Sequence, residues 1–269
     1  MIRQWTPQLA DQWKIFVPPA RPSLSELAFI EKYMLSFVKE RRNFRLLILG
    51  STPEYRDLAL TYSVDYVCVD YNKQNFLELG KYMYHRDSEK NVIEGDWHSM
   101  TFSNEFDMVI GDFASAVIPV SDHDVFFGNI YRALRQGGMC ILKTPLREGN
   151  KRPNHKEMVE RYRNERSYLN PFPGMLFDVL LMNYDFEKDT MDCSITLEAL
   201  KNSHEIGIFN DYEFDEIAKR LIANGKLHIN VPLKNEFIKN LQKIFHVEIT
   251  SGSDWYKDGI PLILLRKND

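Results

Sequence analysis

The sequence has no apolar stretch of the roughly twenty residues that a membrane-spanning helix needs. Its beginning, MIRQWTPQLADQWKIF, contains no apolar segment of the kind found in signal peptides. Cysteine is scarce, because Cys68, Cys140 and Cys193 are widely separated and form no C-x-x-C pair, and an H-E-x-x-H motif is absent. We therefore expect a cytoplasmic protein without a metal site, in which the three thiols pack as small core residues.

An excess of positive charge is also missing. The 269 residues include 34 lysines and arginines against 38 aspartates and glutamates, which gives a net charge of -4. Proteins that bind polyanions carry a basic surface, so the sequence does not support nucleic acid as a partner. With 44% hydrophobic residues and no internal repeat, the composition is that of one large or two small globular domains. It leaves the oligomeric state open.

The most informative stretch is residues 45–70, RLLILGSTPEYRDLALTYSVDYVCVD. The continuous apolar run Leu46–Leu49 is typical of a strand that is buried on both faces of a parallel sheet. A turn follows at Gly50, then a short helix over Tyr55–Ser63, and then a second apolar run that ends at Asp70. Such a crossover leaves a crevice where turn amides and an acid can meet the ribose of a nucleoside.

The glycine-rich fingerprint of dinucleotide-binding proteins, G-x-G-x-x-G, is absent from this turn. Thr52 stands at the place of the second glycine, and Glu54 follows two residues later. A pyrophosphate needs close approach to the backbone and is repelled by a nearby carboxylate, whereas a cationic ligand is attracted by it. The turn therefore disfavours NAD and favours a positively charged nucleoside.

Two later strands are predicted to end in acids as well. Residues 91–97 contain Asp96, and residues 105–112 end in Asp112. Because parallel strands end at the same edge of a sheet, both carboxylates are expected beside Asp70. Alternating helices and strands complete a doubly wound α/β sheet. The further elements predicted for it are helices over 73–85 and 121–134, strands over 139–143 and 227–231, a helix over 234–245, and an antiparallel pair over 247–250 and 260–266.

The residues before this alternating pattern, and those that interrupt it after residue 147, do not follow the strand and helix alternation. An arm over residues 1–22 contains Trp5 and Trp13, which are expected to dock onto the body, and Ser23 with Glu26 forms a capping box that opens a long helix. The strand and helix alternation stops after residue 147, which indicates a helical insertion or lid that carries the acceptor site. The predicted divisions are 1–42 for the arm and helix, 43–147 for the ligand-binding core, 148–226 for the insertion and 227–269 for the remainder of the sheet.

These motifs resemble those of the class I S-adenosylmethionine-dependent methyltransferases. LLILGSTPE is similar to their first motif, VCVD to the second, EGDWHSM to the third and FDMVIGDF to the fourth, and YRALRQGGMCIL and IPLILLRK follow in order. The likeness covers about residues 43–145 and 227–266. The TPE turn and the GDW sequence resemble, more narrowly, a bacterial subgroup. The family implies a Rossmann-like seven-stranded sheet with an antiparallel last strand.

The resemblance implies S-adenosyl-L-methionine as cofactor and S-adenosyl-L-homocysteine as product. It implies that Asp70 binds the ribose hydroxyls, that Asp96 accepts from the adenine amino group, and that Asp112 faces the methionine portion and the substrate. The full set of implied cofactor contacts is Gly50, Ser51, Thr52, Glu54, Asp70, Tyr71, Asp96, Trp97 and Asp112. Arg21 is a further candidate, because its planar fork suits the cofactor carboxylate.

One departure from the family pattern concerns the cofactor ammonium. Most members carry an acid two residues before the first glycine, where this chain has Ile48. We hypothesise that Glu54 or Asp112 supplies the missing charge. For Arg21 the alternative is a surface pair with Glu26 or Glu31.

The expected reaction is in-line transfer of a methyl group to a small-molecule or peptide acceptor, which depends mainly on alignment and desolvation. A general base is needed only for a protonated acceptor, and the candidates are His98, Asp112 and His123. Both histidines also have structural interpretations, His123 as part of a helix start capped by Ser121 or Asp122. Two other functions stay open, an NAD(P)-dependent oxidoreductase and a non-catalytic S-adenosylmethionine-binding regulator.

Overall fold

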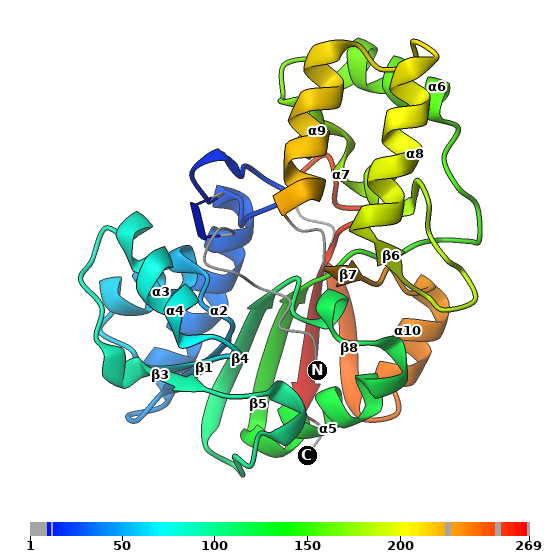
Figure 1. Ribbon diagram of the computed structural model, residues 1–269. Helices are drawn as coiled ribbons and strands as arrows, with labels where there is room; N and C mark the ends of the chain where they lie inside the picture. Colours follow the sequence, from blue (N-terminus) through cyan, green and yellow to red (C-terminus); the bar gives the residue numbers. More distant parts are fainter. Residues whose placement is uncertain (1–9, 12, 224–226, 251–253, 268–269) are drawn as a thin grey trace.

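The apolar runs of the sequence form a single seven-stranded sheet at the centre of the molecule (Figure 1). The computed structural model describes residues 10–11, 13–223, 227–250 and 254–267. The strand order is β3-β2-β1-β4-β5-β9-β8, and only β9 runs antiparallel to its neighbours. The predicted doubly wound, Rossmann-like sheet is thus confirmed. The strands are β1 Arg45–Leu49, β2 Asp65–Asp70, β3 Val92–Glu94, β4 Phe106–Asp112, β5 Leu134–Lys143, β8 Phe245–Thr250 and β9 Leu262–Lys267.

The continuous apolar runs are explained by helices on both faces of the sheet. Leu46 and Ile48 of β1 pack in one core cluster, whereas Leu47 and Leu49 pack in another. The first cluster lies under α2 Leu24–Glu40, α3 Pro53–Thr61 and α4 Lys73–Leu79; the second lies under α5 His123–Ala133 and α10 Lys234–Leu241. Cys68, Cys140 and Cys193 are buried and free, as predicted for core residues, and burial raises the pKa of each thiol.

The predicted capping box fixes the start of α2. The backbone N–H of Glu26 donates to Ser23 Oγ at 3.1 Å, and the N–H of Ser23 donates to Glu26 Oε2 at 2.8 Å. This reciprocal pair satisfies two amides that a helix start leaves open. It also holds the Glu26 carboxylate at the edge of the sheet, where its second role is described below.

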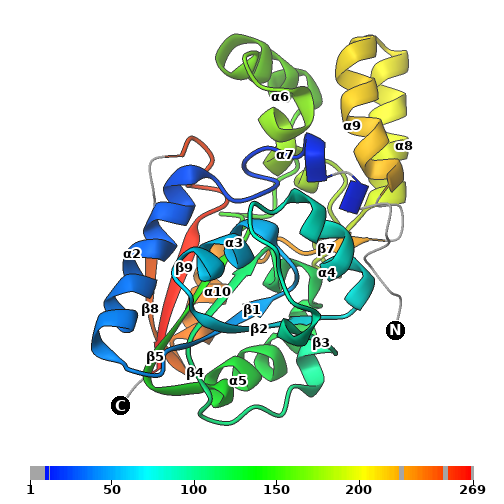
Figure 2. The same ribbon diagram turned by 90° about the vertical axis from the view of Figure 1, so that its left-hand side faces the viewer.

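A helical lobe stands over the carboxyl ends of the parallel strands (Figures 1 and 2). It has its own apolar core, which includes Trp13 and Phe16 of the arm and contacts Phe113 after β4. The docking of the arm is confirmed for Trp13, while Trp5 lies outside the described residues. The lobe contains α6 His155–Arg161, a π-helical turn Tyr162–Arg166, α7 Pro171–Leu181, α8 Cys193–Glu205 and α9 Asp211–Ala223.

The prediction that residues 227–231 return to the main sheet is wrong. β7 His228–Ile229 pairs with β6 Met191–Asp192 in a separate two-stranded sheet. Asn230 explains this course, because its side-chain amide donates to the carbonyl of Ala116 at 2.8 Å and so ties the segment to the loop after β4. Residues 227–231 therefore connect the helical lobe to the body and do not add a strand to the main sheet.

Several boundaries also differ from the predictions. β5 begins at Leu134, where α5 has just ended, so the residues around Gly137 belong to a strand with an irregular register. β3 stops at Glu94, because Asp96 caps a 3-10 turn over Trp97–Ser99. α4 ends at Leu79 and continues only as a 3-10 turn. Within the described ranges, no helix is long and apolar enough to cross a bilayer.

Candidate functional site

The turn after β1 brings the backbone to the carboxyl edge of the sheet. Gly50 has a φ of +92°, which a residue with a side chain rarely adopts, and its N–H donates to the carbonyl of Val69 at 2.8 Å. A Cβ on Gly50 would lie 3.9 Å from the ring of Trp97. Thr52 is the N-cap residue of α3 but makes no side-chain hydrogen bond to it. The turn is therefore fixed by backbone geometry rather than by side-chain capping.

Asp70, at the end of β2, is buried and fully oriented. Its Oδ2 accepts from the hydroxyl of Ser51, and its Oδ1 accepts from the N–H of Asn72 at 2.9 Å. Burial raises the pKa of Asp70, whereas these hydrogen bonds lower it. Tyr71, the next residue, is about one-third exposed at the rim of the site. Ser51 and Asp70, which the sequence assigns to one ligand, thus contact each other directly.

Trp97 and Asp96 lie on the far side of the Gly50 turn. The indole Nε1 of Trp97 donates to the carbonyl of Val69 at 2.7 Å, so the ring is fixed beside the ends of β1 and β2. Asp96 Oδ1 accepts from the backbone N–H of His98 at 2.9 Å. This bond begins the 3-10 turn and orients the Asp96 carboxylate.

His98 is held between two carboxylates. Its Nδ1 lies 2.8 Å from Asp96 Oδ1, and its Nε2 lies 3.3 Å from Asp122 Oδ2. Asn129 of α5 donates to the carbonyl of His98 at 2.8 Å. Nδ1 is hydrogen-bonded to Asp96, whereas Nε2 lies near Asp122 without a hydrogen bond in the described structure, and the contact with Asp96 agrees with the structural interpretation of this residue.

His123 has a structural position as well. Its Nε2 lies 3.1 Å from the carbonyls of Ser115 and Ile118, and burial lowers its pKa. Asp122 is the N-cap residue of this helix, as one of the two predictions had it, but its side chain makes no hydrogen bond to the helix, and Ser121 donates to Asp122 instead.

Asp112, at the end of β4, belongs to a buried charge cluster that sequence reasoning missed. Lys143 stands opposite it in the register of β4 and β5, and its Nζ lies 2.9 Å from Asp112 Oδ1 and 3.2 Å from Glu26 Oε2. Lys143 has no exposed surface. Burial raises the pKa of both Asp112 and Glu26, and the ammonium of Lys143 opposes this shift. The sequence does contain a signal for this cluster, because Lys143 is a charged residue at the end of an apolar strand and the preceding predicted strand ends in Asp112.

The backbone after Asp112 adopts an unusual conformation. Phe113 has a φ of +56°, which is unfavourable for a residue with a bulky side chain. Its N–H donates to the carbonyl of Lys143 at 3.0 Å, which holds the sharp turn against β5. Outliers of this kind cluster at functional sites. The turn directs the chain out of the sheet directly above the charged edge.

Glu54 and Arg21 close the site on the side of the arm. The Arg21 guanidinium pairs with Glu54 Oε1, and the indole of Trp13 donates to the same oxygen at 3.3 Å. The alternative pairings of Arg21 with Glu26 or Glu31 are therefore wrong. Glu54 Oε2 is buried and has no hydrogen-bond partner among the described residues. Burial raises the pKa of Glu54, and Arg21 opposes the shift.

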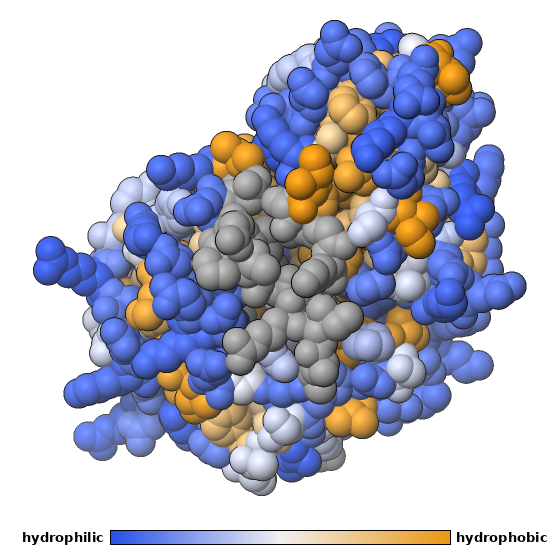
Figure 3. All heavy atoms as spheres, viewed as in Figure 1, coloured by the Kyte–Doolittle hydropathy of each residue, from blue (hydrophilic) through white to orange (hydrophobic). Residues whose placement is uncertain are grey.

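The part of the edge around Asp112 and Glu54 has more negative than positive groups. Three carboxylates, Glu26, Glu54 and Asp112, face two cations, Arg21 and Lys143. A cavity of about 180 Å³ borders Glu26 from the side of the loop that follows β8. In Figure 3 apolar side chains gather where the helical lobe meets the body, whereas most of the surrounding surface is hydrophilic. Such an edge is suited to a ligand that carries positive charge.

Comparison with known proteins gives one family match and solved structures of similar fold. Residues 49–142 match the model of a family described as a methyltransferase domain. No curated protein matches. A Rhodobacter sphaeroides protein named for Zn-dependent alcohol dehydrogenases is 12% identical, with 97% of this chain and 98% of that chain covered and a TM-score of 0.57. The PH0226 protein of Pyrococcus horikoshii OT3 is 15% identical, with 96% and 99% covered and a TM-score of 0.53.

At such low identities the two solved structures show a shared fold and nothing about chemistry. The family match is more informative, because its limits run from the end of β1 into β5. Gly50, Asp70, Asp96 and Asp112 all lie inside it. The segment that carries these four residues is therefore similar to a methyltransferase domain, whereas Arg21, Glu26 and Lys143 lie outside the match.

Proposed function

We propose that the protein is an S-adenosylmethionine-dependent methyltransferase that acts on a small-molecule or peptide acceptor. The observation that carries the proposal is the set of oriented carboxylates, Asp70, Asp96 and Asp112, at the carboxyl edge of a segment similar to a methyltransferase domain. In open α/β sheets, ligands bind at this edge, next to the point where the strand order reverses. Here that point lies beside β1.

The charge and shape of the site fit the cofactor. S-adenosylmethionine carries a sulfonium, an ammonium and a carboxylate, and so one net positive charge, while the group around Asp112 and Glu54 has three carboxylates and two cations. Gly50 leaves the backbone open to close approach, with the ring of Trp97 beside it. We propose that Gly50, Ser51 and Thr52 contact the methionyl end, that Asp70 holds the ribose beside Tyr71, and that Asp96 and Trp97 hold the adenine.

Glu54 is the best candidate for the missing partner of the ammonium. Its Oε2 is buried without a hydrogen-bond partner in the described structure, and such an atom is costly unless a ligand satisfies it. Asp112 Oδ1 also has no regular hydrogen bond in the described structure, but it forms an ion pair with Lys143 at 2.9 Å. Arg21 neutralises part of the Glu54 charge and stands where a ligand carboxylate can also reach it. Glu54→Gln is therefore expected to weaken binding more than Asp112→Asn, and the opposite ranking would reject the role of Glu54.

When bound, the cofactor supplies an already activated methyl group, so alignment is the main task of the protein. Asp112 is the proposed catalytic contact, since it lies at the methionine end and its pKa is raised by burial. His98 remains a weaker candidate for a base, because both of its ring nitrogens already have carboxylate neighbours. We propose that the arm and its helix at 1–42 and the helical lobe at 148–226, which share an apolar core through Trp13 and Phe16, exclude water and bind the acceptor.

Neither alternative function has a specific observation in its favour. The carboxylate of Glu54, whose side chain is 11% exposed, opposes the pyrophosphate of NAD(P) in the adjoining turn. A regulator that binds without turnover would keep the same cofactor edge, and only an acceptor-dependent assay would distinguish it.

Calorimetric titration with S-adenosylmethionine, S-adenosylhomocysteine and NAD in parallel tests the proposal. We expect saturable one-to-one binding of the first two ligands and its loss in Asp70→Ala. Asp65→Asn is the matched control, because Asp65 begins the same strand at the opposite edge and its side chain is 66% exposed. Binding of NAD alone would overturn the proposal in favour of an oxidoreductase.

A further inference from the structure

A buried arginine beneath the turn after β1 has no part in the function proposed above. Arg56, on α3, is 1% exposed, and its partner Asp87 is almost as deeply buried. Removing a guanidinium from water is costly unless its donors are satisfied in good geometry. The partners of Arg56 are therefore informative about what this residue holds in place.

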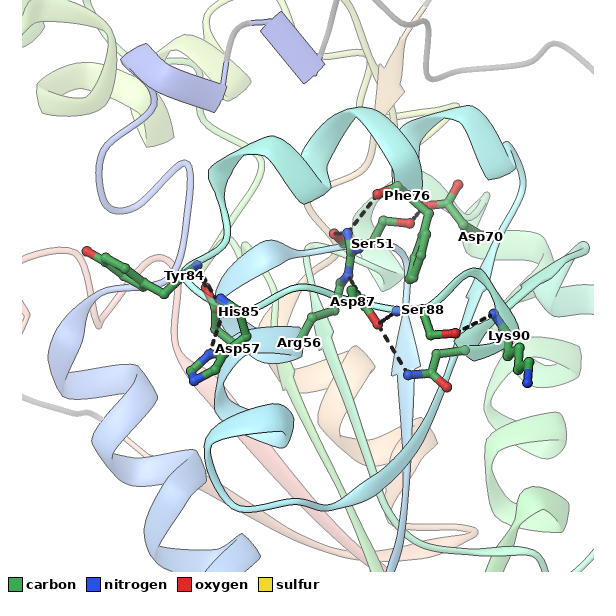
Figure 4. Close-up of polar contacts among 11 residues, drawn as sticks. Ser51, Arg56, Asp57, Asp70, Phe76, Tyr84, His85, Asp87, Ser88 and Lys90 are labelled. Atoms are coloured by element: carbon green, nitrogen blue, oxygen red, sulfur yellow. Dashed lines mark hydrogen bonds and ion pairs between the residues drawn. The ribbon is translucent and has the colours of Figure 1, made fainter.

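The donors of Arg56 reach three separate segments (Figure 4). Its Nη1 donates to the carbonyl of Phe76 in α4 at 2.9 Å and to the carbonyl of Ser51 in the turn at 3.3 Å. Its Nε donates to Asp87 Oδ2 at 2.7 Å, in the loop before β3. The guanidinium also lies over the ring of Phe76, with 3.6 Å between its Cζ and the ring centroid. One side chain thus joins the turn, α4 and this loop.

The anchor on the far side is itself fixed. Asp87 Oδ1 accepts from the N–H of Ser88 at 2.6 Å and from the side-chain amide of Asn91 at 3.2 Å. Each carboxylate oxygen of Asp87 therefore has a partner. Arg56 consequently cannot move without breaking a network that extends to the start of β3.

On the near side, the network ends at the proposed ribose carboxylate. The carbonyl of Ser51 accepts from Arg56, and the hydroxyl of the same Ser51 donates to Asp70 Oδ2. The buried positive charge of Arg56 also acts on Asp70, whose pKa it lowers against the effect of burial. Figure 4 shows Ser51 between the two side chains. Arg56 thus influences Asp70 by geometry and by charge.

We propose that Arg56 is a positioning residue for Asp70. By holding the backbone of Ser51, it fixes the carboxylate in the orientation that two ribose hydroxyls need. It therefore determines the affinity for the adenosyl half of the ligand more than for the methionyl half. The inference rests on the proposed function, because it requires a ribose at Asp70. A lysine cannot replace Arg56, since an ammonium lacks the planar fork that reaches three partners at once.

The test measures how much of the binding affinity depends on one ribose hydroxyl. Calorimetry compares S-adenosylhomocysteine with its analogue that lacks the ribose 2′-hydroxyl, in the wild type, Arg56→Lys and Arg41→Lys. In the wild type, the analogue should bind at least about tenfold more weakly, as expected for a hydrogen bond to a carboxylate. In Arg56→Lys this ratio should fall below about threefold, because Asp70 is no longer held in place. Arg41→Lys alters an ion pair at the opposite edge and should retain the wild-type ratio.

A folded Arg56→Lys could bind S-adenosylhomocysteine more weakly and still show the wild-type ratio between the affinities for S-adenosylhomocysteine and for its 2′-deoxy analogue. That result would overturn the inference, because Arg56 would then be a purely structural residue. Should that variant fail to fold, Asp87→Ala removes the anchor of the guanidinium and should lower the ratio in the same way; an unchanged ratio there also overturns the inference. A wild type that binds S-adenosylhomocysteine and its 2′-deoxy analogue equally well overturns this inference and the assignment of the ribose to Asp70, while binding of the cofactor itself stands. A wild type that does not bind it overturns the proposed function as well.

Discussion

Two buried aspartates on the same strand, Asp107 and Asp112, lie in opposite electrostatic surroundings. Asp107 is the second residue of β4, at the amino edge, and has no exposed surface. Its oxygens accept from Arg41 at 2.6 Å, from Arg135 at 2.8 Å and from the backbone N–H of Arg45 at 2.9 Å. Two cations thus surround one acid.

At the other end of β4, Asp112 shares a single buried lysine with Glu26, and nearby Glu54 keeps an oxygen without a partner in the described structure. Buried charges are usually paired and fully hydrogen-bonded. The amino edge satisfies this rule with its own residues, and the carboxyl edge does not. The comparison indicates that Asp107 serves the fold, whereas the carboxyl edge is completed by a cationic ligand.

The largest effect is expected from Asp107→Ala. The change removes the acceptor of three donors, and breaking a buried ion pair from one side costs about 3 kcal/mol of unfolding free energy. Urea denaturation should show this loss, while calorimetry should show unchanged affinity for S-adenosylhomocysteine. A comparable loss of affinity would show that the two edges are not functionally distinct.

Glu54→Gln should lower the ligand affinity and leave the stability nearly unchanged, the reverse of what is expected for Asp107→Ala. Losing the carboxylate that meets the ligand ammonium should lower the affinity for S-adenosylhomocysteine about tenfold, or about 1.4 kcal/mol, with little change in stability. Asp57→Asn is the matched control, because Asp57 lies on the same helix and its carboxylate accepts from the backbone N–H groups of Tyr84 and His85, both at 2.9 Å, rather than from a described residue of the site. Equal losses in both variants would argue that helix α3 is merely distorted.

The pH dependence of the unfolding free energy gives a further test of the difference between the two edges, through Glu54 at the carboxyl edge. Burial raises the pKa of Glu54 above its usual 4.5. Between the two values the folded state holds more protons than the unfolded chain, so the unfolding free energy falls as pH rises through this window and recovers below it. The Glu54→Gln variant lacks this group. Its stability relative to the wild type should therefore increase with rising pH, as measured by denaturation across the window, and a decrease would contradict the raised pKa.

The smallest effect is expected from His98→Asn. The His98 side chain is 21% exposed and pairs with two carboxylates at the surface of the site. Partly exposed pairs contribute about 0.5 kcal/mol, so the affinity for S-adenosylhomocysteine should change by less than about threefold. A much larger loss would place His98 in direct contact with the ligand.

The sheet could be predicted from the sequence because each of its buried strands is a continuous apolar run, as in Leu46–Leu49 and the run that ends at Asp70. Parallel strands end at one edge, so the predicted grouping of Asp70, Asp96 and Asp112 required no long-range information. The prediction failed at residues 227–231, because an apolar alternation does not reveal which sheet a short strand joins.

The charge cluster could not be predicted with the same ease. Lys143 and Glu26 are 117 positions apart, and only the packing of α2 against the sheet brings their side chains together. The pair of Arg21 and Glu54 depends in the same way on where the arm docks. The narrower resemblance to a bacterial subgroup stays a prediction, as do the acceptor and the lid role of the helical lobe.

A crystal structure of the protein with S-adenosylhomocysteine tests the central claim most directly. The account predicts the ribose at Asp70, the adenine between Asp96 and Trp97, and the ammonium within hydrogen-bond distance of Glu54 Oε2. Ligand density at another face of the sheet, with the carboxyl edge unchanged, would contradict the claim that this edge is completed by a cationic nucleoside.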